Sequence, residues 1–241
     1  MKYVMADIHG CFDKFIKMLE KINFSEKDTL YILGDIIDRG PEPIKMIQYV
    51  MKHKNIILLK GNHEAMMLIC LLGRSLSNNI IWDNNGGGIT YDQFEELSEK
   101  EQNQILDYLK KIPNYIIVDD KILVHAGIYN RKISTVKTIE ENMENQYEDD
   151  LLWIRDEFLF APTTLEGYTV IFGHTPTQYM SYIQKPMKIW HDKLHEDKIG
   201  IDCGCVFEDG QLACLCLDTM EEFYILKKKK PSALICWGLK S

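Results

Sequence analysis

Three short apolar segments near the N-terminus each end in a polar loop, and this arrangement limits the fold more than any other feature of the chain. The segments Lys2–Ala6, Thr29–Leu33 and Asn55–Leu59 have the pattern of strands, and two amphipathic stretches between them, Phe12–Ile22 and Pro43–Met51, have the pattern of helices. Strands that alternate with helices predict βαβ units and a largely parallel sheet. Such sheets place their ligands beyond the carboxyl ends of the strands, so the three polar loops are the first place to look for function.

The middle of the chain is predicted to be helical and the remainder to be rich in strands. Helical patterns run from Glu64 to Ile112, are broken at Gly73–Asn79 and Gly86–Gly88, and include a charged amphipathic stretch at Asp92–Lys111. We expect a helical cap insertion at about residues 73–114. Later strands are expected at Tyr115–Val118, Lys121–Val124, Thr169–Phe172, Lys198–Asp202, Gln211–Leu217 and Glu222–Leu226, forming a second sheet packed against the first. No linker or internal repeat divides the chain, which predicts a single α/β domain over residues 1–241.

Composition and charge exclude several classes of protein. With 46% hydrophobic and 27% charged residues in 241, the chain has the composition of an ordinary globular protein. Its net charge of -8 predicts no stable binding to nucleic acid, so a phosphate substrate would need a local positive site. Its longest apolar run, Ala65–Leu72, is far shorter than the roughly 20 residues of a membrane span, and Asp7 interrupts any signal-peptide core. We therefore expect a cytoplasmic protein that does not bind membranes.

The seven cysteines are an odd number, which argues against a secreted disulfide framework. Two CxC pairs, Cys203-Gly-Cys205 and Cys214-Leu-Cys216, admit two interpretations. One is a zinc site, although CxxC is the commoner spacing for zinc. The other is a pair of core strands, because residues two apart lie on one face of a strand. We favour core cysteines.

The predicted strand-end loops carry carboxylate, amide and imidazole side chains. They are Asp7-Ile8-His9-Gly10, Gly34-Asp35-Ile36-Ile37-Asp38-Arg39-Gly40, Gly61-Asn62-His63-Glu64, His125-Ala126-Gly127 and Gly173-His174-Thr175. Four of the seven histidines lie in these loops, whereas His53, His191 and His195 do not. Each residue alone has a structural explanation, since Asp and Asn cap helices and Gly permits turns. Together they form a mixed oxygen and nitrogen set that suits Mn, Fe, Zn or Co better than calcium.

In their order along the chain these motifs resemble those of the calcineurin-like metallophosphoesterases, and specifically the phosphoprotein phosphatase family of serine/threonine phosphatases and symmetrical diadenosine tetraphosphatases. The family has the motifs GDxHG, GDxxDRG and GNHE, then a histidine that precedes small residues, and finally a Gly-His pair. Motifs of these forms occur in this sequence in the same order. Here 28 residues separate Asp7 from Asp35 and 27 separate Asp35 from Asn62, about one βαβ crossover each. The resemblance runs over roughly residues 1–217. It implies a two-sheet β-sandwich flanked by helices, with a helical cap insertion.

The sequence departs from the family pattern at two positions. Ala6 stands in place of the first glycine of GDxHG, and the fourth motif is His125-Ala126-Gly127 where many eukaryotic members have HGG. Neither substitution alters a ligand atom. With Ala126 and its length of 241 residues, the chain resembles the bacterial and phage branch of the family. Asn85-Gly86-Gly87 with Thr90 and the segment Trp153-Ile154-Arg155 also resemble that branch.

The resemblance implies a centre with two divalent metal ions. Matched by position, Asp7, His9 and Asp35 would hold one ion, Asp35 would bridge to the second, and Asn62, His125 and His174 would complete the ligands of that second ion. Two divalent ions roughly 3.5 to 4 Å apart repel each other strongly, so a bridging carboxylate is also a physical requirement. A bridging hydroxide would be the nucleophile for in-line attack on phosphorus. Manganese is the first expectation, with Fe, Zn, Co or Ni as alternatives.

The resemblance also implies roles for four further residues. His63 would be the general acid that protonates the leaving group, and Asp38 would orient its imidazole. Arg39 would clamp the phosphate in a bidentate fork, and Arg155 would be a second clamp. An ordinary surface ion pair with Asp156 or Glu157 is the alternative for Arg155. Glu64 is expected to lie at a helix start or behind the ligands rather than among them.

Four functional hypotheses remain open from the sequence. The first is a serine/threonine protein phosphatase-like phosphomonoesterase acting on a phosphorylated protein. The second is a symmetrical diadenosine tetraphosphate hydrolase acting on a dinucleoside polyphosphate, for which Trp82, Tyr91, Tyr129 and Tyr147 are candidate stacking residues. The third is a cyclic-nucleotide or RNA phosphodiesterase, and the fourth a non-enzymatic scaffold. The retained ligand set disfavours the scaffold.

Overall fold

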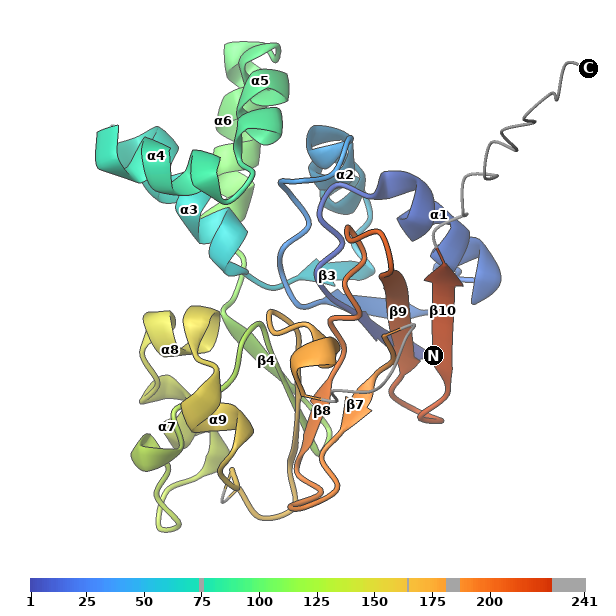
Figure 1. The fold of residues 1–241 in the computed structure, drawn as a ribbon, viewed down its shortest axis with the longest axis vertical. Coiled ribbons are helices and arrows are strands. Elements are labelled where there is room, and N and C mark those ends of the chain that lie inside the picture. The colour runs from blue at the N-terminus through green and yellow to red at the C-terminus, as the bar shows by residue number, and fades with distance from the viewer. Residues whose placement is uncertain (74–75, 164, 181–186, 227–241) are drawn as a thin grey trace, which may run out of the picture.

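A computed structural model describes residues 1–73, 76–163, 165–180 and 187–226 of the chain. These residues form two mixed sheets that pack face to face (Figure 1). The first sheet has the strand order β10-β9-β1-β2-β3. Its members are β1 (Lys2–Met5), β2 (Thr29–Ile32), β3 (Ile56–Leu58), β9 (Gln211–Cys216) and β10 (Glu222–Leu226). The second sheet has the order β4-β5-β6-β8-β7. Its members are β4 (Tyr115–Val118), β5 (Lys121–Val124), β6 (Thr169–Phe172), β7 (Trp190–His191) and β8 (Lys198–Gly200). The expected two-sheet architecture is confirmed.

The last two strands belong to the first sheet, which corrects the expectation that they join the second. β9 runs antiparallel to β1, with Tyr3 opposite Cys216, and β10 pairs with β9 as a hairpin. The parallel part of this sheet, β1-β2-β3, is as predicted. The error has a physical reason: an apolar pattern indicates that a segment is a buried strand, but it does not specify which strand lies beside it.

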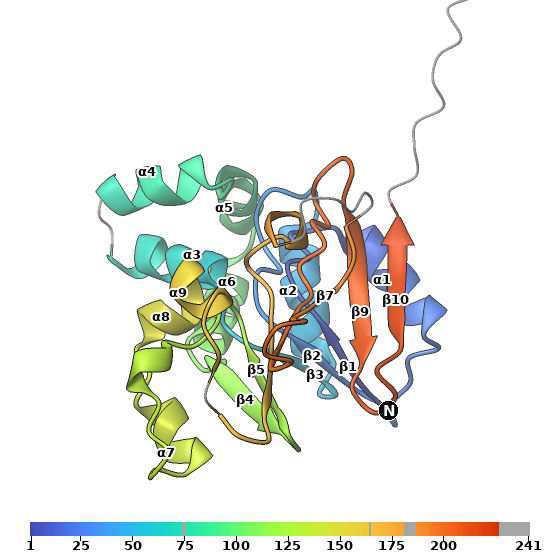
Figure 2. The same ribbon diagram turned by 60° about the horizontal axis from the view of Figure 1, so that its bottom comes forward.

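Helices cover the outer face of each sheet (Figures 1 and 2). The helices α1 (Phe12–Lys21) and α2 (Pro43–Lys52) pack on the first sheet. Three short helices that the sequence did not reveal, α7 (Ile139–Glu144), α8 (Glu148–Trp153) and α9 (Asp156–Leu159), pack on the second. Two 3₁₀ turns, η1 (Asn130–Lys132) and η2 (Thr177–Tyr179), lie in loops. Within the described ranges, the chain has no helix with the length and apolar composition that a membrane crossing requires.

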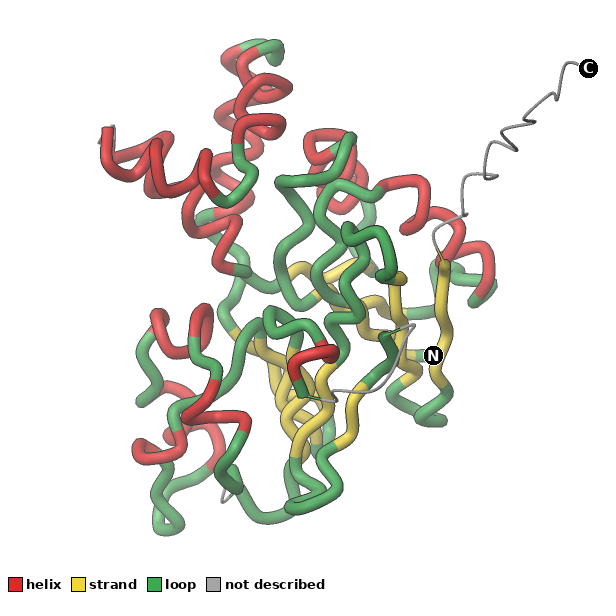
Figure 3. The backbone as a smooth tube through the Cα atoms, in the orientation of Figure 1, coloured by secondary structure: helices red, strands yellow, loops and turns green. Residues whose placement is uncertain are grey.

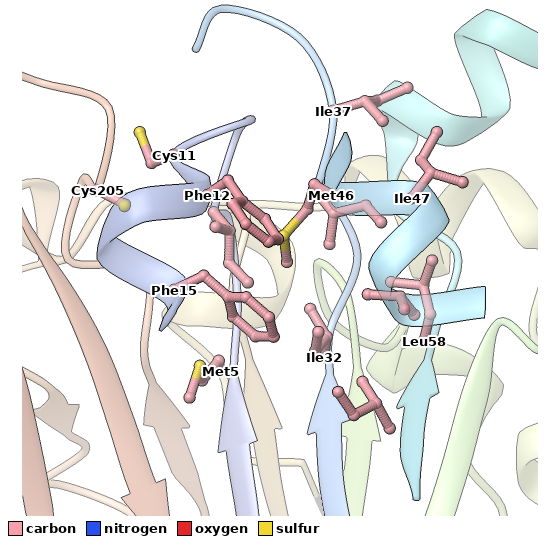
Figure 4. Packing of buried hydrophobic residues seen from close by; sticks show 14 of the residues in the cluster. Met5, Cys11, Phe12, Phe15, Ile32, Ile37, Met46, Ile47, Leu58 and Cys205 are labelled. Carbon is pink, nitrogen blue, oxygen red and sulfur yellow. The ribbon is translucent and has the colours of Figure 1, made fainter. Parts of the chain in front are cut away.

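Alternation along the strands builds three apolar layers. Val4 of β1 and Leu123 of β5 both lie in the layer between the sheets. Their neighbours point outward, Met5 toward α1 and Val124 toward α7 to α9. Figure 4 shows Phe15 of α1 lying over Met5 and Ile32 of the first sheet. Because side chains alternate with a period of two, each strand supplies both a central and an outer layer.

Four helices lie beyond the edge of the first sheet (Figure 2). They are α3 (Asn62–Gly73), α4 (Leu76–Asn84), α5 (Gly88–Glu95) and α6 (Glu99–Leu109). The last three lie within residues 73–114, the predicted cap, and the first precedes it. The charged stretch expected as one amphipathic segment is divided between α5 and α6. Ser98 causes the division, because it begins α6 with a capping box in which its hydroxyl accepts the Glu101 N–H. The assignment of the chain to one domain stays a prediction.

The cysteines support the core interpretation of the CxC pairs. Cys203, Cys205, Cys214 and Cys216 are buried free thiols. Cys205, Cys214 and Cys216 pack in the layer beneath α1, and Cys203 packs between the sheets. Among the described residues, no cysteine belongs to a cluster of three or more potential metal ligands. Cys236 lies outside the described residues.

Candidate metal centre

The strand-end loops converge as the parallel topology predicts. Asp7 follows β1, Asp35 follows β2, His125 follows β5 and His174 follows β6. Asn62 begins α3, and three residues separate it from the end of β3. In Figure 3 the loops gather in the middle of the molecule, between the cap helices and those covering the second sheet. They enclose a cavity of about 670 Å³. Of the predicted site residues, this cavity is lined by Asp7, His9, Asp35, Arg39, Asn62, His63, Arg155 and His174.

The backbone at the site is held in an unusual conformation. Ten described residues other than glycine have positive φ angles, and six of them are predicted site residues: Asp7, His9, Asp35, Asp38, Arg39 and His174. The left-handed region costs a non-glycine residue free energy, on the order of 1 kcal/mol or more. Such a concentration indicates that the surrounding fold imposes these conformations in order to aim the side chains.

Two glycines allow the acidic side chains to approach the backbone closely. A Cβ on Gly61 would lie 2.2 Å from Asp35 Oδ1, and a Cβ on Gly173 would lie 2.2 Å from Asp7 Oδ2. Real Cβ atoms do not approach oxygen so closely, so each carboxylate occupies space that only glycine leaves open.

Two clusters of potential ligands share one carboxylate. The first consists of His9, Asp35 and His63, and the second of Asp35, His125 and His174. Asp35 Oδ2 lies 3.9 Å from His9 Nε2 and 3.6 Å from His125 Nε2. Asp35 is therefore placed to bridge two cations. Asp7 is not a member of either cluster, and both of its carboxylate oxygens accept the backbone N–H of His174.

The contacts of His125 fit a bound cation. Its Nδ1 lies 2.7 Å from the carbonyl oxygen of Leu33, and its Nε2 lies 2.9 Å from Asn62 Oδ1. A neutral imidazole has one N–H, so either tautomer leaves a nitrogen lone pair facing an oxygen lone pair. A metal ion held by His125 Nε2 and Asn62 Oδ1 would remove this repulsion, with the N–H donated to Leu33.

His174 provides a second, independent sign of a cation. Its Nδ1 lies 3.2 Å from Asn62 Oδ1, while its Nε2 is buried without a hydrogen-bond partner. A buried polar atom without a partner is rare and calls for a specific explanation. The residues that the structure brings together therefore fit a group of divalent metal ions.

The protonation of the site also suits metal binding. Burial lowers the pKa of His9 to about 3 and lowers the pKa values of His125 and His174. These imidazoles are therefore neutral near pH 7, the form that binds metals. Burial and the nearby charges of Asp202 and Asp35 raise the pKa of Asp7 well above its usual range. Cations among these carboxylates would offset that repulsion.

Asp38 anchors His63 through a network that reaches into the cap. Asp38 Oδ2 lies 2.5 Å from His63 Nδ1 and accepts the indole N–H of Trp82 at 2.8 Å. The hydroxyl of Thr90 donates to Asp38 Oδ1 at 2.5 Å. Burial opposes the charge of His63, but Asp35 and the hydrogen bond to Asp38 outweigh it and raise the pKa of His63. The roles of Trp82 and Thr90 on Asp38 could not be derived from their sequence positions.

Arg39 lies over the two imidazoles of the first cluster. Its Nη1 is 2.8 Å from His9 Nε2 and its Nη2 is 2.9 Å from His63 Nε2. Its backbone N–H donates to the carbonyl of Gly86 at 3.0 Å, and its Nε donates to the carbonyl of Asn85 at 3.2 Å. The glycine-rich segment of the cap therefore holds the guanidinium over the cavity.

Arg155 faces the same cavity from the turn between α8 and α9, the helices that cover the second sheet. Its Nη1 donates to Thr175 Oγ1 at 2.9 Å and to the carbonyl of His174 at 3.3 Å. Among the described residues it forms no ion pair with Asp156 or Glu157, so the surface ion pair considered as an alternative is absent there.

Glu64 supports Asp35 from behind. It is fully buried, and its carboxylate accepts the backbone N–H groups of Asp35, Ile36 and Gly61 at 2.8, 3.0 and 2.9 Å. The expectation that Glu64 lies at a helix start and outside the ligand set agrees with this geometry. Its hold on the loop after β2 depends on long-range contacts that the motif does not reveal.

Sequence reasoning missed Asp202 as an acidic residue of the site. Asp202 is buried, lines the cavity, and follows β8 in the same way that Asp7 follows β1. Burial raises the pKa of Asp202 to about 6. The expected strand Lys198–Asp202 ended on this carboxylate, so the strand-end rule could have found it.

The nucleoside-stacking candidates need correction. Trp82 is buried with its N–H on Asp38, so it offers no free ring face. Tyr91, Tyr129 and Tyr147 are not among the residues that line the cavity. The aromatic residues that do line it are Trp153, Phe160, Tyr179 and Phe207.

The histidines left out of the site lie away from it. His191 pairs with Glu222 at 2.7 Å, and His195 lies 3.2 Å from Asp192. Asp192, His195 and Asp197 form a third acidic cluster, but the ammonium of Lys198 lies 3.1 Å from Asp192 and 3.0 Å from Asp197. The ammonium of Lys198 is therefore already the cation that pairs with the two carboxylates of this cluster.

A family model matches most of the chain. The family model described as calcineurin-like phosphoesterase matches residues 3–212. A symmetrical bis(5'-nucleosyl)-tetraphosphatase of Hamiltonella defensa is 33% identical over 148 residues, which are 59% of this chain and 50% of that protein. The chain thus spans about half the length of that relative. An asymmetrical bis(5'-nucleosyl)-tetraphosphatase of Halalkalibacterium halodurans is 24% identical over 253 residues, covering 95% of this chain and 94% of that protein.

Solved structures share the fold. A crystal structure of a candidate diadenosine tetraphosphatase has a TM-score of 0.68 at 19% identity and covers 95% of this chain and 94% of its own. A protein serine/threonine phosphatase from Saccharomyces cerevisiae has a TM-score of 0.63 at 14% identity, covering 96% of this chain and 81% of its own. At these identities the likeness shows the fold alone.

Proposed function

Because this chain belongs to the calcineurin-like phosphoesterase family, we propose that it hydrolyses phosphoester bonds at a centre of two divalent metal ions. The observation that carries this proposal is the pair of ligand clusters that share Asp35 at the edge of a cavity. Two arginines that can bind phosphate, Arg39 and Arg155, line the same cavity.

The residues that would hold the ions are those of the strand-end loops. We assign Asp7, His9 and Asp35 to one ion and Asp35, Asn62, His125 and His174 to the other. When bound, the ions supply Lewis acidity at the phosphate and lower the pKa of a water molecule toward neutrality. Manganese is our first choice of metal because carboxylate and amide oxygens suit it, and Fe, Zn, Co or Ni are the alternatives because the site also offers imidazoles.

His63 is proposed as the general acid. Its Nδ1 is fixed by Asp38, so its Nε2 faces the cavity. Once the guanidinium of Arg39 turns away from this nitrogen, Nε2 can carry the proton that the leaving oxygen receives. The raised pKa of His63 favours the protonated form that this role requires. Asp38 acts by orienting the imidazole, and the hydrogen bonds from Trp82 and Thr90 keep that carboxylate in place.

Arg39 and Arg155 are proposed to bind the phosphoryl oxygens. Arg39 contacts the imidazole nitrogens of His9 and His63, both of which face the cavity. Its guanidinium would have to turn from these nitrogens to engage a phosphate while His9 binds metal. Arg155 is already anchored by Thr175 on the opposite side, so a phosphate between the two arginines would be held from both.

Two substrate classes follow from this chemistry. A phosphoserine or phosphothreonine protein was the first expectation from the sequence motifs, and the yeast phosphatase shares the fold. The specific observation in favour of a dinucleoside polyphosphate is that relatives aligned over half and over nearly all of their own length carry tetraphosphatase names.

The test is hydrolysis of p-nitrophenyl phosphate by the purified chain with added Mn²⁺, with and without chelator. We expect turnover that chelator abolishes. Asp35→Asn should lose bound metal and turnover together, whereas His63→Asn should keep its metal while turnover slows by on the order of 100 to 10,000-fold. The surface variant His191→Asn is the matched control and should behave as the wild type. Absence of turnover with every divalent metal, or normal turnover in His63→Asn, would contradict the proposal or the acid assignment respectively.

A further inference from the structure

Exposed aromatic side chains gather around the mouth of the candidate metal centre. Trp153, Phe160, Tyr179 and Phe207 line its cavity, with exposed fractions of 42%, 74%, 62% and 41%. They come from three separate segments: α8 and the end of α9, the η2 turn, and the loop between β8 and β9. Single exposed apolar residues are common on proteins, but a group around one cavity marks a binding site.

These rings have faces available for a ligand. Among the described residues, no other aromatic ring stacks against Phe160, Tyr179 or Phe207. Phe207 lies beside Gly204, where any side chain would collide with its ring. Trp153 differs from the others, because its ring packs edge-on against His174 with centroids 6.0 Å apart. It connects the aromatic wall to the metal ligands.

The remaining lining is charged and suits phosphate. Arg39 and Arg155 face the cavity together with four aspartates, Asp7, Asp35, Asp156 and Asp202. Two divalent cations would more than offset the excess of carboxylates and make the floor positive. A ligand that fits both parts has an anionic phosphate group joined to a flat, weakly polar ring, and a nucleotide has this structure. An aliphatic or hydroxylated peptide side chain would not need several unpaired ring faces.

We propose that Phe160, Tyr179 and Phe207 form stacking surfaces for the nucleobases of a nucleotide substrate whose phosphates lie between Arg39 and Arg155. The inference rests on the proposed function and names its substrate class. Base stacking on an aromatic side chain is insensitive to base identity, since every base has a π face. The site therefore selects nucleotides over other phosphoesters without strong preference among bases.

The experiment compares kcat/KM for diadenosine tetraphosphate, a phosphothreonine peptide and p-nitrophenyl phosphate. The variants are Phe160→Ala, Tyr179→Ala and Phe207→Ala, with Phe160→Tyr as the conservative variant. Tyr147→Ala is the control, because Tyr147 is 69% exposed but is not among the residues that line the cavity. The measured quantity is the ratio of kcat/KM for the dinucleotide to that for p-nitrophenyl phosphate.

We expect each alanine variant to lower this ratio by about 10-fold, mainly through KM, the effect of losing one stacked base. Phe160→Tyr and the control Tyr147→Ala should both keep the wild-type ratio. An unchanged ratio in all three alanine variants would overturn the inference, as would a selective loss with the phosphothreonine peptide. Failure of the wild type to hydrolyse p-nitrophenyl phosphate would instead overturn the proposed function, so the two failures are distinguishable.

Discussion

Glu64 accepts the backbone N–H of Asp35 at 2.8 Å, and this bond ties the start of α3 to the loop that carries the shared carboxylate. The same Glu64 oxygen accepts the N–H of Gly61, and the other oxygen accepts the N–H of Ile36. All of these groups are buried, so a lost acceptor would leave an N–H without a partner. The position of Asp35 therefore depends on a residue that does not itself reach the cavity lining.

We predict that Glu64→Gln lowers the free energy of unfolding by about 2 to 3 kcal/mol, because one amide group cannot accept all three N–H groups as the carboxylate does. Urea unfolding in the presence of chelator measures this without a contribution from bound metal. Glu148→Gln is the control, since Glu148 is half exposed in its ion pair with Lys60 and should cost less than about 1 kcal/mol. Similar losses in both variants would show that Glu64 has no special part in holding the loop.

Trp82 should affect turnover through Asp38 and not through substrate contact. Trp82→Phe keeps most of the buried ring but removes the N–H that donates to Asp38 Oδ2 at 2.8 Å. Because Asp38 orients His63, we expect kcat for p-nitrophenyl phosphate to fall about 5 to 30-fold while bound metal is unchanged. Trp190→Phe, in the second sheet, is the control and should keep the wild-type kcat. A kcat for Trp82→Phe equal to that of the wild type would remove Trp82 from the network.

The parts of the site that the sequence could predict follow from local rules. Asp7, Asp35 and Asn62 come directly after apolar segments that are separated by helical patterns, and parallel strands bring such positions to one edge. The same rule places His125 and His174 after β5 and β6. Each of these predictions requires only the local pattern and the direction of the strand.

The parts that could not be predicted depend on which distant segments meet. The pairing of β9 with β1 joins residues more than 200 positions apart, and no local pattern encodes that partner. The hydrogen bond of Trp82 to Asp38 is similar, since it depends on how the cap lies over the second loop. The short helices α7 to α9 were hidden because six or fewer residues give too little periodicity to recognise.

Gly173 should be intolerant of a methyl group because of the space it leaves for Asp7. A Cβ there would lie 2.2 Å from Asp7 Oδ2 and 2.7 Å from Ala6 Cβ. We expect Gly173→Ala to weaken Mn²⁺ binding at least 10-fold in isothermal titration and to destabilise the fold by about 2 kcal/mol or more. Gly167→Ala is the control, since Gly167 has φ +80 but nothing within 4 Å of its Cβ position. It should cost about 1 kcal/mol of backbone strain and leave Mn²⁺ affinity unchanged, and equal affinity in both variants would argue against the crowding at Asp7.

The buried ion pair of Asp192 and Lys198 should make stability depend on pH in the acid range. Burial opposes the charge of Asp192, but hydrogen bonds from the backbone of Leu194 and from Lys198 outweigh it and lower its pKa to about 2. The folded-state pKa lies below the ordinary value of 3.8, so the stabilisation is fully present above about pH 4 and is lost as the pH falls toward 2. Lys198 is itself buried and donates to the carbonyl of Ala161 at 2.6 Å, so removing Asp192 also leaves an ammonium with less compensation.

Asp192→Asn should therefore be less stable than the wild type by about 2 to 3 kcal/mol at pH 6, with a smaller difference at pH 2.5. Urea unfolding at both pH values, with chelator present, gives the two differences. Asp107→Asn is the control, because Asp107 pairs with Lys110 at the exposed surface and should change stability by less than about 0.5 kcal/mol at either pH. A difference for Asp192→Asn that stays constant between pH 6 and pH 2.5 would mean that the carboxylate of Asp192 is not held ionised by the fold, because a group with an unshifted pKa contributes no pH dependence to unfolding.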